Sequence, residues 1–420
     1  MSVSPARVCA YTVIRRVFEQ GAYADRALRG EAAGLSPRDR ALATQLAFGT
    51  VQRMATLDYV AGRFSKRPAD KLDAPVLAAV RLGLFQLLFL GGVADHAAVN
   101  ESVELCKRFA RGGSGYVNAV LRRATREGRG VLDELDDSTP ERAAVLHSVP
   151  GWLASQWFAE LGPDEARALL AVVNEPAEAA LRMNTLKAPD GVTLAVRARP
   201  VCGVPEGRVL DEPFDVHGSA LFADGLVIPQ SRASMAVARM LDPAAGERIL
   251  DLCAAPGAKT THLAALTGGE GEIVAVEQHP GRAKALRETC ATMGAANVSV
   301  VEGDARSFVA SAPFDRVLVD PPCTGLGTLQ SRPDLRWRRD PSSIPELVEL
   351  QRAILDAGAD ALRPGGTLVY SVCTISRSEG EGVIDAFLAA HPRFTEVDRR
   401  QLLPHRDGTD GFFIARLRSV

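Results

Sequence analysis

The sequence lacks several features that would assign the chain to a specialised class of protein. It has no apolar run of the ~18–20 residues that a membrane-spanning helix needs, since the longest, residues 82–94, includes Gln86. Its N-terminus shows no basic start followed by an apolar core and a cleavage site, so no secretion signal is expected. Neither sign of charge dominates, because the formal net charge is −2. We therefore expect a folded cytoplasmic protein with no membrane partner.

Paired cysteines are also missing. The seven cysteines are scattered, and no two of them have CxxC spacing. Without an export signal, reduced thiols are more consistent with this pattern than disulfide bonds. A zinc site would need further Cys or His ligands at fitting spacing, so no metal is expected.

The first 140 residues consist of one predicted helix after another. At roughly 150 residues per domain, a chain of 420 residues is expected to form two to four domains. Ser36 and Pro37 are typical of a helix start, with serine as the cap and proline in the first turn. Residues 128–130, Gly-Arg-Gly, predict a loop near the end of this all-α domain. Residues 145–235 mix helix and strand signals, which predicts a small α+β module.

From residue 237 to residue 420, short apolar strands alternate with helices. This alternation predicts an α/β domain with a mainly parallel, doubly wound sheet. The charge divides along the same lines, with +5 in residues 1–145, −4 in 146–236 and −3 in 237–420. The front domain is therefore the basic one, although +5 alone also fits an ordinary solvated surface.

The ends of the predicted parallel strands carry the candidate chemistry, because ligands bind at the carboxyl edge of such sheets. The first strand runs into small residues and Gly257, which allow a ligand to approach the backbone before a helix N-terminus. The loop matches neither GxGxxG nor GxxxxGK[ST], which disfavours a nicotinamide dehydrogenase and a phosphate loop. Glu277 and Asp304 follow the next two strands, where they suit ribose hydroxyls and an adenine amino group, or serve as helix caps.

Two cysteines follow the fourth and fifth predicted strands. Cys323 ends an Asp-Pro-Pro-Cys run that begins at Asp320, and Cys373 follows Tyr370-Ser-Val. A lone cysteine in an apolar segment is usually inert packing, but two thiols at one strand edge are typical of a reactive site. The other cysteines, apart from Cys253 in the first strand-end loop, are predicted to pack in the core: Cys9, Cys106, Cys202 and Cys290.

These motifs resemble a known enzyme family. Residues 180–420 resemble the RNA (cytosine carbon-5) methyltransferases of the Nol1/Nop2/Sun type, chiefly in the two-cysteine arrangement. Residues 5–126 resemble a NusB-like RNA-binding domain, notably in residues 38–43 and 117–123. The resemblance implies an all-α NusB-like domain over 1–140, an α+β RNA-binding or linker module over 145–235, and a Rossmann-like methyltransferase domain over 237–420.

The resemblance also implies residue roles. Cys373 is the expected nucleophile and Cys323 the residue that aids product release, with Asp320 and Lys259 assisting them. S-adenosyl-L-methionine is the expected cofactor, and the residues expected to bind it or line its pocket are Cys253, Ala254, Ala255, Pro256, Gly257, Ala258, Lys259, Glu277, Asp304 and Asp320.

The expected substrate is RNA, most of all 16S ribosomal RNA, and the protein is expected to act as a monomer. A cytosine-C5 methyltransferase acting on tRNA or another RNA stays an alternative, as does a non-catalytic NusB-like RNA-binding factor. Seven arginines of the front domain are candidates for phosphate contacts: Arg15, Arg16, Arg38, Arg40, Arg122, Arg123 and Arg126.

Overall fold

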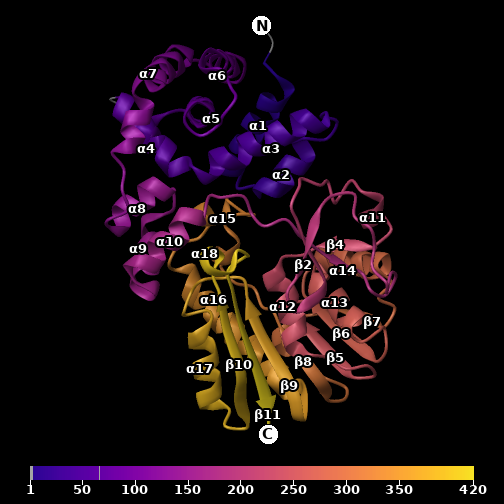
Figure 1. Cartoon of the computed structure of the whole chain (residues 1–420). Helices are drawn as coiled ribbons and strands as arrows, with labels where there is room; N and C mark the ends of the chain where they lie inside the picture. The colour runs from indigo at the N-terminus through magenta and orange to yellow at the C-terminus, as the bar shows by residue number, and fades with distance from the viewer. Residues whose placement is uncertain (1–2, 66) are drawn as a thin grey trace. The chain divides into compact units, whose positions relative to one another are not determined.

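The chain forms two compact units. The computed structural model describes residues 3–65 and 67–420, which are drawn in Figure 1. The first unit consists of Met1–Glu175 with Leu329–Arg339, and the second of Pro176–Thr328 with Asp340–Val420. The division into three domains therefore stays a prediction. In the described ranges, every helix is too short or too polar to cross a membrane.

The first unit is helical, as predicted. Ser36 caps α3, where its hydroxyl accepts a hydrogen bond from the backbone N–H of Asp39 at 3.1 Å. The apolar run of residues 82–94 begins in the most buried helix, α5, which explains why this run has hardly any polar face. The helices are α1 (Pro5–Gln20), α2 (Ala24–Glu31), α3 (Pro37–Gln52), α4 (Met54–Phe64), α5 (Ala74–Leu88), α6 (Asp95–Phe109), α7 (Ser114–Asp133), α8 (Pro140–His147), α9 (Gly151–Leu161) and α10 (Pro163–Val172), with a 3-10 turn at Ala69–Lys71.

The loop predicted at residues 128–130 is wrong, because α7 continues through it to Asp133. Gly128 is buried where α7 packs on α5. A Cβ atom there would lie 2.7 Å from Leu88 Cδ2, closer than side chains tolerate. The glycine thus serves close helix packing, and tertiary contacts override its low helix propensity.

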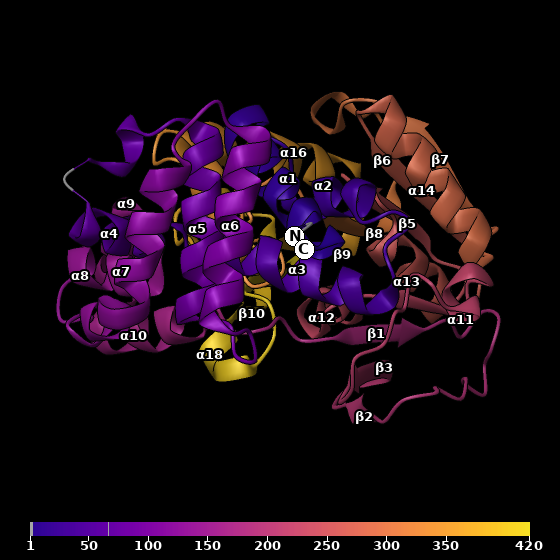
Figure 2. The ribbon, with the colours of Figure 1, turned by 90° about the horizontal axis from the view of Figure 1, so that it is seen from above.

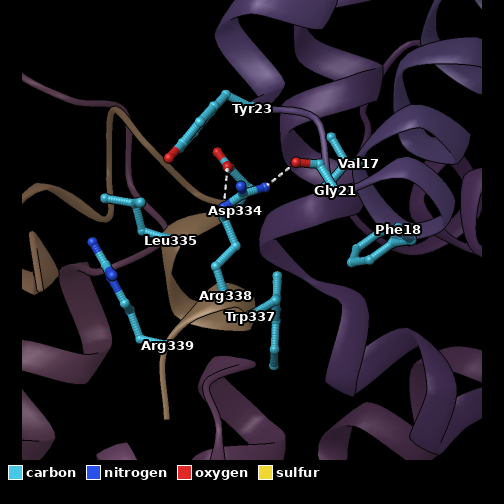
Figure 3. Close-up of a pocket in the computed structure, with 9 residues that line it drawn as sticks. All are labelled: Val17, Phe18, Gly21, Tyr23, Asp334, Leu335, Trp337, Arg338 and Arg339. Carbon is cyan, nitrogen blue, oxygen red and sulfur yellow. Dashed lines mark hydrogen bonds and ion pairs between the residues drawn. The ribbon is translucent and has the colours of Figure 1, made fainter. Parts of the chain in front are cut away.

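The segment Leu329–Arg339, which follows the Cys323 motif in sequence, packs within the helical unit. Arg336 is fully buried, and its Nη1 donates to Ser148 O at 3.0 Å and to Asn174 Oδ1 at 2.7 Å. Burial lowers the pKa of Arg336 to about 9. The short helix α15 (Leu335–Arg338) lies beside α1 and α2, where Arg338 donates to Gly21 O at 2.6 Å (Figure 3). The residues in that view line a cavity of about 440 Å³.

The second unit begins with a small antiparallel sheet. Its strands are β1 (Ala180–Met183), β2 (Ala198–Val201), β3 (Val204–Leu210) and β4 (Val227–Pro229), in the order β2-β3-β1-β4. Figure 2 shows β2, β3 and β1 side by side. The short helix α11 (Ala220–Ala223) and the helix α12 (Arg232–Leu241) follow, and neither was predicted from the sequence.

A seven-stranded sheet forms the rest of the second unit, and it confirms the α/β prediction. The strand order is β10-β11-β9-β8-β5-β6-β7, and β9-β8-β5-β6-β7 run parallel. The strands are β5 (Arg248–Leu252), β6 (Glu272–Glu277), β7 (Val298–Glu302), β8 (Phe314–Val319), β9 (Leu362–Val372), β10 (Phe394–Leu402) and β11 (Phe412–Ser419). β10 and β11 are antiparallel additions at one edge, of which β10 was not predicted.

Helices cover both faces of this sheet. One apolar cluster joins it to α16 (Ser343–Ala361) and α17 (Glu381–Ala390), and another joins it to α12, α13 (Ala258–Leu266) and α14 (Pro280–Met293). Short 3-10 turns lie at Ala305–Ser307 and Leu326–Thr328, and the short helix α18 lies at Pro404–Asp407. With both faces covered, the carboxyl edge of the parallel strands is the place left for a ligand.

Two glycines test the packing of the helical unit. A Cβ at Gly49 of α3 would lie 2.0 Å from Phe85 Cζ, whereas a Cβ at Gly62 of α4 would meet nothing within 4 Å. We expect Gly49→Ala to lower the free energy of unfolding by about 1–3 kcal/mol through overpacking. Gly62→Ala is the matched control and should raise it by about 0.5–1 kcal/mol. Calorimetry of both variants checks this, and equal melting temperatures would contradict it.

Candidate active site

The loop after β5 is shaped for close approach to its backbone. Cys253 has a φ of 66°, a left-handed conformation that is rare outside glycine, and Gly257 has a φ of 106°. A Cβ on Gly257 would also lie 2.8 Å from Leu286 Cδ1. Glycine is therefore required just before α13 begins at Ala258.

Four consecutive side chains in the first turns of α13 each hold a polar partner. Lys259 Nζ donates to Asp320 Oδ2 at 2.6 Å, and Thr260 Oγ1 donates to Asp251 Oδ2 at 2.7 Å. The next two residues, Thr261 and His262, contact β1 and β3 of the small sheet. The start of α13 is therefore fixed from two sides, by the strand ends of the large sheet and by the small one.

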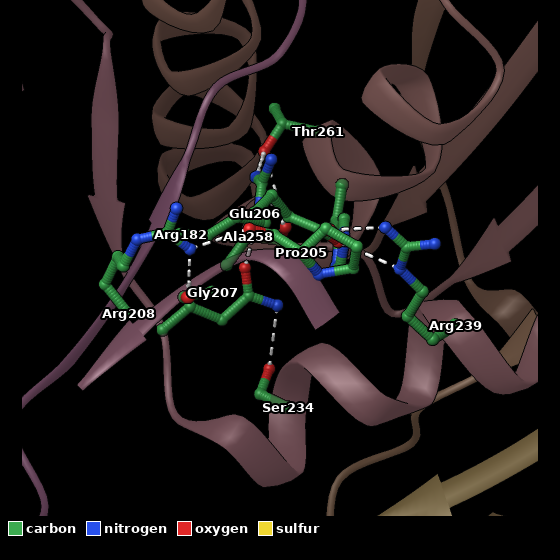
Figure 4. A network of polar contacts seen from close by, with 11 residues as sticks. Arg182, Pro205, Glu206, Gly207, Arg208, Ser234, Arg239, Ala258 and Thr261 are labelled. Carbon is green, nitrogen blue, oxygen red and sulfur yellow. Dashed lines mark hydrogen bonds and ion pairs between the residues drawn. The ribbon is translucent and has the colours of Figure 1, made fainter. Parts of the chain in front are cut away.

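The contacts to the small sheet form a buried network (Figure 4). Arg182 of β1 is fully buried, and it donates to Thr261 Oγ1 at 2.9 Å and to Gln230 Oε1 at 2.8 Å. Glu206 of β3 accepts hydrogen bonds from His262 Nε2, at 2.5 Å, and from Arg239 of α12.

Burial and charge set the protonation states in this network. Burial lowers the pKa of His262 to about 4, although the hydrogen bond to Glu206 acts against this. Burial acts to raise the pKa of Glu206, but the bonds from His262 and Arg239 outweigh it and lower that pKa to about 2. Near neutral pH the imidazole is therefore uncharged, and it donates through Nε2 to an ionised carboxylate.

A cavity lies at the carboxyl ends of β5, β6 and β7. Three of the predicted cofactor residues line it, namely Cys253, Glu277 and Asp304. Glu277 is buried, and its Oε1 accepts a hydrogen bond from His279 N at 2.9 Å. Asp304 is largely occupied by Arg306, whose guanidinium and backbone N–H bind its carboxylate and lower its pKa. Asp304 therefore caps the short turn that follows it, which is one of the two roles that the sequence allowed.

The residues of this cavity fit S-adenosylmethionine. The buried Glu277 carboxylate suits ribose hydroxyls, and Gly303 leaves open space where a side chain would stand. Apolar groups of Pro322, Leu350 and Ile354 complete the lining and suit an adenine ring. The rest of the predicted loop, Ala254 to Ala258, is not among the residues that line the cavity.

The ends of the neighbouring strands β8 and β9 bring the two strand-end cysteines together. Cys323 Sγ lies 3.3 Å from Cys373 Sγ, and both residues are partly exposed. Asp320 lies at the same edge, where its Oδ1 accepts from Ser371 Oγ at 2.8 Å while its Oδ2 binds Lys259. The four predicted catalytic residues are therefore one cluster: Lys259, Asp320, Cys323 and Cys373.

The charges around the two thiols differ. Burial disfavours the Lys259 ammonium, but the charges of Asp320 and of a Cys373 thiolate outweigh burial and raise the pKa of Lys259. For Cys323, the hydrogen bond with Cys373, burial and nearby carboxylates all raise its pKa well above the usual thiol value. The lysine thus faces Cys373 with positive charge, whereas Cys323 stays a neutral thiol.

Comparison with known proteins agrees with this arrangement. The family model described as "16S rRNA methyltransferase RsmB/F" matches residues 238–418, and the NusB family model matches residues 4–126. A "Probable ribosomal RNA small subunit methyltransferase B" of Bacillus subtilis is 35% identical over 91% of both chains. The "Ribosomal RNA small subunit methyltransferase B" of Pseudomonas putida is 34% identical over 98% of both.

The chain belongs to the RsmB/F family.

Solved structures support the same assignment. A methyltransferase homologue from Pyrococcus horikoshii aligns with a TM-score of 0.60 and 27% identity over 67% of this chain and 99% of that one. Another solved chain aligns with a TM-score of 0.82 and 27% identity over 99% of both chains. As a member of the RsmB/F family, the chain is an S-adenosylmethionine-dependent methyltransferase with a NusB-like helical region.

Several residues of this RsmB/F site were not found from the sequence. Ser371, which binds Asp320, was passed over as an ordinary strand residue. Arg182, Glu206 and His262 lie 24 to 80 residues apart, and only the fold brings them together. An arginine inside a strand that is otherwise apolar was the available signal for Arg182, since a buried charge needs a partner.

The buried histidine predicts a pH dependence of stability. In the unfolded chain His262 takes up a proton near its ordinary pKa of 6.5, whereas in the fold it stays neutral down to about 4. Lowering the pH from 7 to 5 therefore favours unfolding by about 2 kcal/mol through this residue. We expect His262→Gln, which keeps a donor for Glu206, to remove that share of the pH dependence in urea unfolding.

The exposed His96 provides the matched control. His96→Gln should leave the difference between the unfolding free energies at pH 7 and pH 5 as in the wild type. An unchanged difference in His262→Gln would show that His262 does not resist protonation in the fold.

Proposed function

We propose that this RsmB/F enzyme methylates carbon 5 of a cytosine in small-subunit ribosomal RNA through a covalent adduct with Cys373. The approach of the two thiols to 3.3 Å carries the proposal. A methyltransferase that acts on an exocyclic amino group has no use for a paired nucleophile, whereas carbon 5 needs activation. The relatives in Bacillus subtilis and Pseudomonas putida are named for ribosomal RNA of the small subunit.

The first step is nucleophilic addition. Carbon 5 of cytosine is a poor nucleophile, and a thiolate that adds to carbon 6 breaks the C5=C6 double bond and leaves an enamine across carbons 4 and 5. The Cys373 sulfur forms the new bond, and the π electrons move toward carbon 5. Lys259 favours this step because its ammonium stabilises the thiolate form of Cys373.

The second step is transfer to carbon 5. When bound, S-adenosylmethionine would supply an electrophilic methyl group and would leave as S-adenosylhomocysteine. Asp320, held by Lys259 and Ser371, would accept a hydrogen bond from the cytosine amino group as charge develops on the ring. The target base must leave its stack to reach these groups.

The third step restores the base. The proton on carbon 5 leaves, its electrons rebuild the C5=C6 bond, and the Cys373 thiolate is expelled. Cys323 adjoins Cys373 and is held as a neutral thiol, so it can relay the proton: it gives its own proton to the departing Cys373 sulfur and takes up the proton that leaves carbon 5. This division of labour uses the difference in charge around the two thiols.

The helical unit is proposed to bind RNA phosphates, and its arginines are not equivalent. Arg15, Arg16 and Arg123 are paired with Glu19, Glu31 and Glu127, which offsets their charge. Arg126 is exposed on α7, one turn from Arg122 and less than a turn from Arg129. These three share one helix face, which suits a phosphate backbone. A monomer acting in the cytoplasm stays the prediction.

Single substitutions of the two cysteines should have opposite outcomes. Cys373→Ala should abolish transfer of labelled methyl from S-adenosylmethionine to ribosomal RNA, because no adduct forms. Cys323→Ala should accumulate a protein–RNA adduct that survives a denaturing gel, because elimination is impaired. Cys290→Ala, a buried cysteine of α14, is the control and should behave as wild type.

Either of two results would contradict the role assignment. One is methyl transfer by Cys373→Ala at the wild-type rate. The other is the absence of any adduct with Cys323→Ala under conditions where the wild type methylates the RNA.

The charge on α7 gives a separate test. We expect Arg126→Glu to weaken RNA binding by about five- to tenfold near physiological salt and to reduce the salt dependence of affinity. Lys284→Glu on α14 makes the same charge change at an exposed lysine and is the matched control. Filter binding at several salt concentrations measures both, and equal affinities would rule out Arg126 as a phosphate contact.

A further inference from the structure

A buried carboxylate contacts the residues that follow both cysteines. Glu379 has no exposed surface and lies two residues before α17. Its Oε1 accepts from the backbone N–H of Thr324 at 2.8 Å, and its Oε2 accepts from Thr324 Oγ1 at 2.6 Å and Thr374 Oγ1 at 3.2 Å. Thr324 directly follows Cys323, and Thr374 directly follows Cys373. One side chain therefore holds both cysteine turns.

Further hydrogen bonds fix Glu379 and complete the bridge. Gln351 of α16 donates from Nε2 to Glu379 Oε1 at 3.1 Å and to the carbonyl oxygen of Pro322 at 3.0 Å. The hydroxyls of Thr324 and Thr374 lie 2.7 Å apart. Tyr370 of β9 donates to the backbone oxygen of Glu379 at 2.7 Å. The residues on both sides of Cys323 are thus held by the same group of side chains.

The burial of Glu379 is unlike that of an ordinary structural acid. Among residues 3–65 and 67–420, no Lys, Arg or His forms an ion pair with it, so hydrogen bonds alone compensate its charge. A buried carboxylate is costly to desolvate, and an apolar side chain would pack here at lower cost. Both of its carboxylate oxygens accept hydrogen bonds from the two cysteine turns and from Gln351. This arrangement points to a role in the geometry of the two turns.

We propose that Glu379 is a positioning residue that sets the placement of the Cys323 and Cys373 thiols relative to each other. This inference rests on the proposed covalent mechanism. The addition step needs Cys373 Sγ at carbon 6, and the elimination step needs Cys323 beside the same sulfur. Because the two cysteines come from different strand ends, a common anchor for both turns keeps their separation fixed through the reaction.

The negative charge of Glu379 also supports the separate roles of the two thiols. Together with Cys373, burial and Asp320, it helps to raise the pKa of Cys323, which keeps that thiol protonated while Cys373 attacks. The geometry and the charge therefore favour the same division of roles.

Glu379→Gln is the direct test, with Glu381→Gln two residues further on as the control. Glutamine has the shape of glutamate, and its carbonyl oxygen can still accept from Thr324 N, so the fold should hold. Glu381 is partly exposed and pairs with Arg377. We expect Glu379→Gln to lower kcat by about tenfold or more, as misplaced reacting groups do. Its KM for RNA, its affinity for S-adenosylmethionine and its Tm should match those of the control.

A purely structural role gives a different result. If kcat, cofactor affinity and Tm all fall together in Glu379→Gln, or if kcat does not change, the positioning role is wrong. A pair of threonine variants covers the case in which Glu379→Gln does not fold. Thr324→Ser keeps the hydroxyl and should retain activity, whereas Thr324→Val should lose it, and equal activities would overturn the proposal.

A trapped adduct separates this proposal from the mechanism on which it rests. In RNA carrying 5-fluorocytosine at the target, carbon 5 bears fluorine in place of the proton that must leave, so the Cys373–carbon 6 bond persists. We expect the wild type to form this adduct and Glu379→Gln to form it more slowly. No adduct with the wild type would contradict the covalent mechanism, whereas equal rates for the two proteins would contradict only the role of Glu379.

Discussion

The meeting of two thiols at neighbouring strand ends is the constraint on which the rest of the site depends. Cys323 and Cys373 follow β8 and β9, which pair in parallel. Their Sγ atoms therefore approach to 3.3 Å although the two residues lie 50 positions apart in the sequence. Two thiolates at this distance would repel each other. The proposed mechanism needs one sulfur ionised and the other neutral. The positive charge of Lys259 favours a Cys373 thiolate, whereas the hydrogen bond with Cys373, burial and nearby carboxylates raise the pKa of Cys323.

The start of α13 connects this pair to the rest of the second unit. Lys259 reaches Asp320 beside the thiols, while Thr261 and His262 reach into the small sheet. A displacement of the small sheet would therefore disturb the Lys259–Asp320 ion pair beside the proposed nucleophile, Cys373. Burying the charges of Arg182 and Glu206 costs desolvation free energy, and the fixed position of α13 is a physical reason for it.

The sequence predicted which residues of the candidate site lie together where the topology of the parallel sheet alone decides this. Parallel strands end at one edge, and this rule alone placed Cys323, Cys373, Asp320 and Glu277 near one another. It failed where packing overrides local preference, as at Gly128, which looked like a loop and lies inside α7. It also failed for side chains whose partners are distant in sequence. Glu379 reads as an ordinary acid before a helix, and only the fold shows that both cysteine turns converge on it.

Bisulfite sequencing of RNA from cells that lack this gene tests the central claim most directly, because 5-methylcytosine resists conversion. The account predicts that one cytosine of 16S ribosomal RNA loses its protection in the deletion strain. The wild-type gene should restore that protection, and a gene carrying Cys373→Ala should not. Unchanged protection throughout 16S ribosomal RNA, or restoration by the Cys373→Ala gene, would contradict it.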